Sequence, residues 1–213
     1  MDFISEALQN YCELHTSEES TVLHQLNRHT HLKVLRPRML SGHLQGQFLT
    51  FLVRMCGAKS ILEIGTYTGY SAIAMAQGMR NDGKIVTIDC NEELQSTVLE
   101  HVQKAGFEQQ ITLKIGAALS LIPELNQSFD FVFIDADKEN YLNYYYSIID
   151  KVQSGGYILA DNVLWSGKVI EEVKEDDQET QAILAFNKAI QEDPRVENIL
   201  LPLRDGLMLI YKK

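Results

Sequence analysis

Oxygen-bearing side chains that could hold a divalent cation follow two apolar runs in the second half of the sequence. Asp135 closes the run FDFVFID, Asp161 closes the run GYILAD, and Asn162 comes next. None of the three offers sulfur or imidazole, so the set suits a hard cation, Mg²⁺ first, with Mn²⁺ or Ca²⁺ as alternatives. Taken singly, each residue also fits an ordinary turn or a helix cap. Together at strand ends, they predict a metal site.

Two further side chains could act beside such a site. Lys138 follows Asp135 by three residues, so both could face one pocket if a helix starts there. A metal and a cationic ligand nearby would favour its neutral amine, which could then act as a general base. A salt bridge to Asp137 or Glu139 is an equally open interpretation. Trp165, the only tryptophan, is expected in the core or as a flat wall for an aromatic substrate.

A glycine-containing segment, residues 65–70 (GTYTGY), lacks the second and third glycines of a dinucleotide fingerprint. Tyr67 would obstruct a pyrophosphate, which disfavours a dehydrogenase. Glu63 would repel phosphate but could bind an ammonium, and Asp89, twenty residues beyond Gly69, could hydrogen-bond ribose hydroxyls. A ribose and a cationic amino-acid group without phosphate describe S-adenosylmethionine. A tight turn without a ligand is the alternative.

Positioning these residues requires strands that alternate with helices. We expect strands at Ser60–Ile64, Lys84–Asp89, Ile111–Ile115, Phe129–Asp135 and Gly156–Asp161, and helices at Ser71–Met79, Glu92–Ala105 and Tyr141–Val152. Two or three helices precede them, and Glu197–Leu201 with Leu207–Tyr211 predict a hairpin. The alternation predicts an α/β fold, a Rossmann-like, doubly wound and mostly parallel seven-stranded sheet with an antiparallel C-terminal strand. Ligands of such sheets lie beyond the carboxyl ends of the strands.

Composition limits the class of protein. The 213 residues carry 19 Lys and Arg against 29 Asp and Glu, a formal charge of −10, and 45% are hydrophobic. These values predict one domain over residues 1–213, with a helical addition at 1–58, and exclude a largely disordered chain. No apolar run reaches the length of a membrane span, and Met1–Glu6 lacks the basic start of an export signal. Three cysteines without C-x-x-C spacing predict a reducing, cytoplasmic compartment.

Charge is unevenly distributed along the chain. The run Glu171–Glu179 is acidic and predicts a solvated loop or a first helical turn, whereas Ser20–Leu62 contains six cations and no acid. That basic stretch predicts solvated helix faces or a contact with an anion. The tyrosines of one helical segment predict packing or a subunit contact: Tyr141, Tyr144, Tyr145 and Tyr146.

Three separated motifs resemble the cation-dependent O-methyltransferases, the family of caffeoyl-CoA and catechol O-methyltransferases and their bacterial relatives. The motifs are residues 63–71 (EIGTYTGYS), 133–141 (FIDADKENY) and 161–167 (DNVLWSG). The likeness extends from about Arg36 to the C-terminus and includes residues 46–49 (GQFL) and 201–206 (LPLRDG).

The resemblance implies a class I methyltransferase fold, a homodimer and a role for each matching residue. Asp89 would bind the ribose, Glu63 would lie near the methionine amine and Ala118 by the adenine. The implied S-adenosylmethionine site comprises Ser41, Glu63, Gly65, Thr66, Tyr67, Ser71, Asp89, Ala118 and Asp135. The implied metal ligands are Asp135, Asp161 and Asn162; the catalytic residues are Lys138, as the base, and Asp135; Trp165 and Ser166 would contact the substrate.

The expected reaction is divalent-cation-dependent transfer of the methyl group of S-adenosylmethionine to a hydroxyl of a small catechol-like or polyphenolic acceptor. Gln45, Ser166 and the acidic segment Val169–Thr180 depart from the plant members, which leaves the acceptor open. One alternative is a wobble 5-hydroxyuridine of transfer RNA, the only case that implies a nucleic-acid partner. Another is a non-catalytic S-adenosylmethionine-binding interaction module. No membrane partner is expected.

Overall fold

The computed structural model describes residues 4–213, which divide into two compact units. One unit comprises Glu6–Ala117, and the other comprises Ala118–Lys213 with Ile4 and Ser5. Residues 1–3 lie outside the described residues. The expectation of no export signal depends partly on them and stays a prediction. The single domain over residues 1–213 also stays a prediction.

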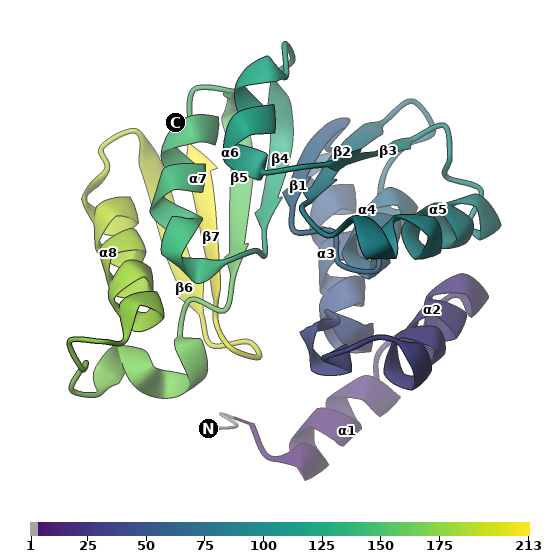
Figure 1. Cartoon of the computed structure of the whole chain (residues 1–213), viewed down its shortest axis with the longest axis horizontal. Coiled ribbons are helices and arrows are strands. Elements are labelled where there is room, and N and C mark those ends of the chain that lie inside the picture. The colour runs from purple at the N-terminus through teal and green to yellow at the C-terminus, as the bar shows by residue number, and fades with distance from the viewer. Residues whose placement is uncertain (1–3) are drawn as a thin grey trace. The chain divides into compact units, whose positions relative to one another are not determined.

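The unit Glu6–Ala117 contains the N-terminal helices and three strands (Figure 1). Its strands are parallel in the order β3-β2-β1, with Ser60 opposite Lys84 and Ile85 opposite Ile111. Strands β1 and β2 are mostly buried, as expected inside a parallel sheet, whereas β3 stands at the end of the strand order and is mostly half-buried. The elements are α1 (Glu6–Leu14), α2 (Thr21–Lys33), η1 (Pro37–Met39), α3 (Gly42–Cys56), β1 (Ser60–Ile64), α4 (Tyr70–Gly78), β2 (Lys84–Asp89), η2 (Glu92–Leu94), α5 (Gln95–Lys104) and β3 (Ile111–Ile115).

The unit Ala118–Lys213 contains four strands in the order β4-β5-β7-β6. Strands β4 and β5 are parallel, while β7 runs antiparallel to both β5 and β6, which confirms the predicted C-terminal hairpin. Its elements are α6 (Ala118–Leu121), η3 (Ile122–Glu124), β4 (Phe129–Ile134), η4 (Lys138–Asn140), α7 (Tyr141–Ile148), β5 (Val152–Asp161), η5 (Trp165–Ile170), α8 (Gln178–Glu192), β6 (Val196–Leu201) and β7 (Leu207–Lys212). The seven strands confirm the predicted α/β class, mostly parallel with an antiparallel end.

Most predicted bounds agree with the structure to within two residues, and the exceptions have local causes. Helix α7 ends at Ile148, short of the predicted Val152, and β5 starts at Val152 because that residue already pairs with Phe129. The predicted helix over Glu92–Ala105 opens as a 3₁₀ turn before α5. Helix α8 was not predicted; the Asp177 side chain caps it by accepting from the main-chain N–H of Thr180.

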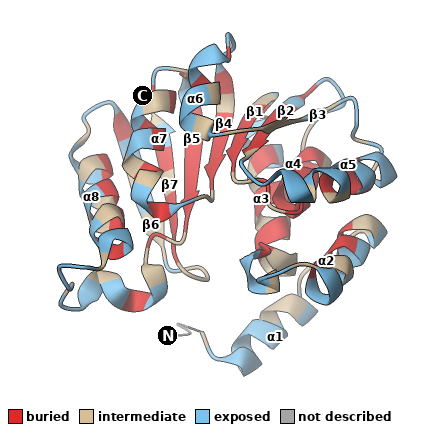
Figure 2. Cartoon of the chain, viewed as in Figure 1, coloured by how far each residue is buried: buried red, intermediate tan, exposed pale blue. Residues whose placement is uncertain are grey.

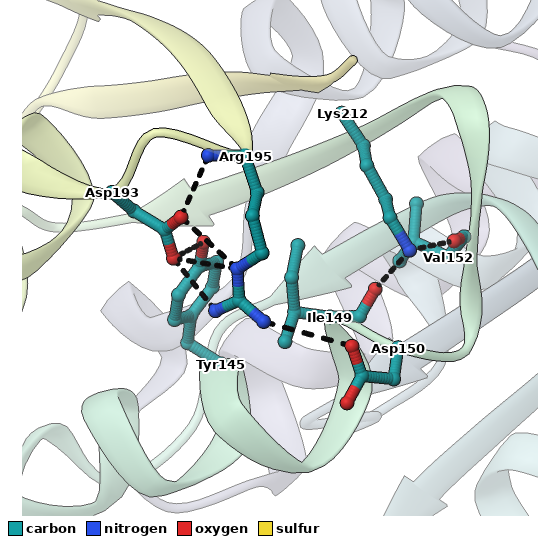
Figure 3. A network of polar contacts seen from close by, with 7 residues as sticks. All are labelled: Tyr145, Ile149, Asp150, Val152, Asp193, Arg195 and Lys212. Atoms are coloured by element: carbon teal, nitrogen blue, oxygen red, sulfur yellow. Dashed lines mark hydrogen bonds and ion pairs between the residues drawn. The ribbon is translucent and has the colours of Figure 1, made fainter.

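The end of α7 is fastened to the turn between α8 and β6 by a network of charged side chains (Figure 3). Asp193 accepts hydrogen bonds from the Arg195 guanidinium at 2.7 Å and from the Tyr145 hydroxyl at 2.8 Å. The Arg195 guanidinium holds the pKa of the Asp193 carboxyl well below its usual range. Lys212 Nζ donates at 2.7 Å to two carbonyls beyond the last turn of α7, those of Ile149 and Val152. Ile149 is the C-cap of α7, a position whose carbonyl has no partner within the helix.

Burial follows the sheet in each unit: most strands are largely buried, β3 and β6 at the ends of the strand order are mostly half-buried or exposed, and the outer faces of the helices are exposed (Figure 2). Helix α4 is the exception, because its sequence YSAIAMAQG is apolar on nearly every side and it is buried almost throughout. Within residues 4–213 no helix has both the length and the apolar character needed to cross a membrane. Cys12, Cys56 and Cys90 form no disulfide bond.

Candidate active site

Residues Gly65–Ser71, which comprise the turn after β1 and the first two residues of α4, are termed the β1 loop. Gly65 (φ 103°) and Gly69 (φ 88°) adopt conformations that favour glycine, and Tyr67 adopts a left-handed φ of 50°. The main chain closes the turn, since Gly65 N donates to Ile88 O at 2.9 Å and Gly69 N donates to Thr66 O at 2.8 Å. The glycines therefore serve a tight strand-to-helix turn, with a tyrosine where a dinucleotide fingerprint needs a glycine.

Asp89, at the end of β2, fastens this loop from its main-chain side. Its Oδ2 accepts from Tyr67 N at 2.7 Å, and its Oδ1 accepts from Asn91 N at 2.8 Å. The carboxylate is therefore held in one orientation at the sheet edge. Each oxygen keeps a second lone pair, which is the acceptor capacity that a ribose hydroxyl requires.

Glu63 is fully buried in β1, and a buried carboxylate is stable only when hydrogen-bonded or paired. The Thr87 hydroxyl of β2 donates to Glu63 Oε2, and Thr87 Oγ1 also lies 2.5 Å from Thr66 Oγ1. Sequence reasoning missed Thr87. The available signal was a threonine within the otherwise apolar run IVTI, residues 85–88. The chain of hydroxyls brings Glu63 and Thr66, two predicted cofactor residues, into one network.

The remaining predicted cofactor residues are placed by other elements. Ser41 directly precedes α3 and is buried, and Ser71 is buried in the first turn of α4. Ala118 is the first residue of α6 and is half-buried. Their roles toward S-adenosylmethionine stay predictions.

In the other unit, Lys138 lies between two of the predicted metal ligands. Its ammonium donates to Asn162 Oδ1 at 2.9 Å and to Asp135 Oδ1 at 3.4 Å. Lys138 is buried, with 6% of its surface exposed, although it is the first residue of a short 3₁₀ turn. Its observed ion pair is thus with Asp135, whereas the sequence left Asp137 or Glu139 open.

Tyr141 is a residue of this site that sequence reasoning assigned to packing or a subunit contact. Its buried hydroxyl accepts from Lys138 Nζ at 2.5 Å and donates to the main-chain carbonyl of Asp161 at 2.8 Å. Burial, with the nearby charges of Asp135 and Asp161, raises the pKa of the Tyr141 phenol well above its usual value. The phenol therefore stays protonated and links Lys138 to the end of β5. No short-range sequence pattern distinguishes it from Tyr145, which is also fully buried.

The segment after β5 has an unusual backbone. Asn162, Trp165 and Ser166 have φ values of 59°, 48° and 54°, all in the left-handed region that costs energy for residues other than glycine. Asp161 is buried, and its Oδ1 accepts from Asn162 N at 2.7 Å. The Trp165 ring centroid lies 5.8 Å from Lys138 Nζ, so the tryptophan lies beside the predicted base.

The turn between β6 and β7 holds this strained segment. Val163 N donates to Gly206 O at 3.1 Å, and Leu164 N donates to Asp205 O at 2.9 Å. The Asp205 carboxylate accepts from Ser166 N at 2.5 Å. Ser166 itself is exposed. Asp205 is the third residue whose role the sequence did not reveal, because its partner lies 39 positions earlier.

The donor set has the chemistry that a divalent cation requires. Among residues 4–213, His, Cys, Asp and Glu side chains form no group of three or more that could hold a metal. The predicted set has a different composition, two carboxylates and one amide oxygen. The Lys138 ammonium already contacts oxygens from two of these residues, so Asp135 and Asn162 converge within reach of one cation. Such oxygen donors fit a hard divalent ion.

The model of the O-methyltransferase family matches residues 13–213. The chain belongs to this family. It is 42% identical over 176 residues to the caffeoyl-CoA O-methyltransferase of Zinnia elegans, an alignment that covers 78% of this chain and 72% of that protein. The match confirms the resemblance to the cation-dependent S-adenosylmethionine O-methyltransferases.

Solved structures agree with this assignment. An O-methyltransferase from Bacillus cereus in complex with SAH has a TM-score of 0.91 and 30% identity, and the alignment covers 97% of each chain. A SAH-bound methyltransferase from Podospora anserina has a TM-score of 0.90 and 30% identity over 98% of this chain and 94% of that one. This O-methyltransferase is therefore an S-adenosylmethionine-dependent enzyme with the class I methyltransferase fold.

Proposed function

We propose that this O-methyltransferase transfers the methyl group of S-adenosylmethionine to a hydroxyl of a small catechol-like acceptor with the help of a divalent cation. The observation that carries the proposal is the position of Lys138. Its amine lies between oxygens of Asp135 and Asn162 and beside Trp165, so one side chain joins the candidate metal ligands to the candidate substrate wall.

Asp135, Asp161 and Asn162 are the residues that would hold the cation, for which Mg²⁺ suits the oxygen donors best, ahead of Mn²⁺ or Ca²⁺. When bound, the cation would lower the pKa of an acceptor hydroxyl from about 10, the value of a simple phenol, toward neutrality.

The chain's own residues would orient the reactants and move the proton. Lys138, in its neutral form, would take the proton of the acceptor hydroxyl at Nζ. Tyr141 stays protonated and holds Nζ against the end of β5, so the amine cannot swing away. Trp165 offers an aromatic face that would align a planar acceptor. Holding donor and acceptor in line can remove on the order of 7–11 kcal/mol of the barrier at best.

The acidic run favours a small acceptor over a polyanionic one. Glu171, Glu172, Glu175 and Asp176 are exposed and directly follow the segment that contains Trp165. A coenzyme A thioester would bring several negative charges toward these carboxylates. The exposed cations of the other unit, Arg28, Lys33, Arg36 and Arg38, are the residues that a transfer RNA acceptor would use.

The test is a methyl-transfer assay with S-adenosylmethionine, Mg²⁺ and a panel of acceptors: catechols, caffeoyl-CoA and a 5-hydroxyuridine-containing RNA. Product is detected as a mass shift of 14 Da, the gain of one CH₂. We expect product with catechols, loss of product with excess EDTA and recovery on adding Mg²⁺. Full activity after exhaustive EDTA treatment would contradict the dependence on a cation. Methylation of the RNA and of no other acceptor would mean that the acceptor is transfer RNA and not a catechol. S-adenosylmethionine binding without methylation of any acceptor would favour the interaction module.

A matched pair of variants tests the metal ligands. Asp161→Asn removes a buried charge at nearly constant shape, whereas Asp137→Asn makes the same change at an exposed position one residue before Lys138. We expect Asp161→Asn to lose turnover and calorimetric Mn²⁺ binding while S-adenosylmethionine affinity largely survives. The Asp137→Asn variant should retain turnover and Mn²⁺ binding. Equal losses in the two variants would count against the role of Asp161.

We also propose a homodimer in a reducing, cytoplasmic compartment. The N-terminal helices expose large apolar side chains, which a second copy could cover: Leu8, Tyr11, Leu14, Phe51 and Met55. The three cysteines form no disulfide bond, which agrees with reducing conditions. Sedimentation equilibrium should return twice the chain mass of 24.2 kDa; a mass of 24.2 kDa at micromolar concentration would contradict the dimer.

A further inference from the structure

Three side chains of the β1 loop bond to the chain that precedes α3, and the proposed chemistry leaves these bonds unexplained. The first is Tyr67, whose left-handed backbone costs energy. Its hydroxyl donates to the main-chain carbonyl of Leu35 at 2.9 Å and approaches that of Arg36 at 3.3 Å. Tyr67 is therefore held on its main-chain side by Asp89 and at its side-chain tip by the segment after α2.

The second contact is entirely buried. Thr68 Oγ1 lies 3.2 Å from Thr30 Oγ1 of α2, and both threonines are at most 1% exposed. Thr30 Oγ1 also bonds to Leu26 O at 2.8 Å within its own helix. A buried hydroxyl is costly without a partner, so this pair specifies where α2 lies against the loop.

The third contact joins the loop to the start of α2. The Tyr70 hydroxyl donates to Glu19 Oε1, which also accepts from Asn27 Nδ2 at 3.3 Å. The Tyr70 ring packs closely on α3, because a Cβ built on Gly46 would lie 2.7 Å from Tyr70 Cε1. This close approach explains why residue 46 is a glycine. Residues 46–49 (GQFL) belong to the family resemblance but have no role in the proposed chemistry.

We infer that the segment Glu19–Arg36 is a positioning clamp for the β1 loop and thereby contributes to S-adenosylmethionine affinity. The contacts come from the start of α2, its last turn and the segment after it, so they hold the loop along its length. Helix α2 also packs beside α4, which continues from the loop (Figure 1). Thr30 and Glu19 act through the loop and are positioning residues. The inference rests on the proposed binding of S-adenosylmethionine at the β1 loop.

Coupling of this kind is reciprocal, which supplies a measurement on the unaltered protein. If the clamp helps to shape the loop for the cofactor, the cofactor must in turn stabilise the clamp. We expect the amides of α2, Thr21–Lys33, to exchange hydrogen more slowly when S-adenosylmethionine is bound. The amides of α1, Glu6–Leu14, serve as the reference in the same unit and should change little.

A matched pair of isosteric variants tests the buried contact. Thr30→Val removes the hydroxyl that meets Thr68. Thr16→Val removes a hydroxyl just beyond the end of α1 that donates to Cys12 O at 2.7 Å. Calorimetry measures the Kd of S-adenosylmethionine, and thermal unfolding measures stability. From the usual value of one hydrogen bond, we expect Thr30→Val to raise Kd about threefold to tenfold. Thr16→Val should leave Kd unchanged.

A double-mutant cycle with Thr68→Val separates a clamp from a general loss of stability. If the two hydroxyls act through their contact, the double variant binds no more weakly than the weaker single variant. Effects that multiply, or a Kd within about twofold of the wild type for Thr30→Val, would overturn the inference. Unchanged exchange in α2 on cofactor binding would overturn it as well, even if Thr30→Val does not fold. A wild-type protein that fails to bind S-adenosylmethionine would instead overturn the proposed function, and the clamp with it.

Discussion

The Tyr141 hydroxyl provides the sharpest test of how this site is built. Tyr141→Phe deletes a single oxygen and keeps the ring, which packs edge-on against Phe186 at 5.5 Å. The deletion removes the acceptor that lies 2.5 Å from Lys138 Nζ and the donor that lies 2.8 Å from Asp161 O. Lys138 keeps its contacts with Asp135 and Asn162, so the amine stays in the site but loses its third restraint.

The size of the effect follows from the two lost hydrogen bonds. A bond to a charged group contributes about 1.5–3 kcal/mol and a neutral one about 0.5–1.5 kcal/mol. The bond to Asp161 O is neutral and contributes mainly to stability. The bond to Lys138 is charge-assisted, and losing it should lower kcat by about tenfold to a hundredfold. The KM for S-adenosylmethionine should change little.

Tyr145→Phe is the matched control for this prediction. Tyr145 lies on the same helix, is equally buried, and donates its hydroxyl to Asp193 at 2.8 Å, among residues distinct from the Lys138 cluster. We expect both variants to unfold at a lower temperature and only Tyr141→Phe to lose kcat. If the two variants keep equal kcat in the methyl-transfer assay, the argument that Tyr141 restrains Lys138 is refuted.

Two further predictions concern the scaffold. Gly206→Ala would place a Cβ 2.4 Å from Leu164 Cγ, at a φ of +89°. We expect the free energy of unfolding, measured by chemical denaturation, to fall by about 1–3 kcal/mol, and turnover to fall with it. Unchanged stability would contradict the close approach. Asp193→Asn weakens the hydrogen bonds from Arg195, which is partly exposed. It should lower the free energy of unfolding by about 1–2 kcal/mol at neutral pH. Because the folded pKa of Asp193 is depressed, this contribution is present above about pH 4 and disappears as the pH falls through the folded value. The difference in unfolding temperature between the wild type and Asp193→Asn should therefore shrink toward acid pH. A difference that grows instead would contradict this prediction.

The order of the elements, and which of their ends carry reactive side chains, can be predicted from local sequence patterns. Apolar runs such as KIVTID and FDFVFI are local signals, since a strand buried on both faces needs a continuous run whatever its partner is. Asp89, Asp135 and Asp161 could be named for the same reason, because each closes such a run. The family motifs added their roles by likeness.

Tertiary structure alone decided which side chains support those residues. Thr87 reaches Glu63, Asp205 reaches Ser166, and Thr30 reaches Thr68, at separations of 24, 39 and 38 positions. A hydroxyl or a carboxylate carries no sequence mark of a partner so far along the chain. Its hydrogen bond is directional over about 3 Å, so only the packing of strands and helices determines whether the two atoms meet. Local sequence patterns therefore predict which residues carry reactive groups, and long-range packing determines which side chains bond to those groups.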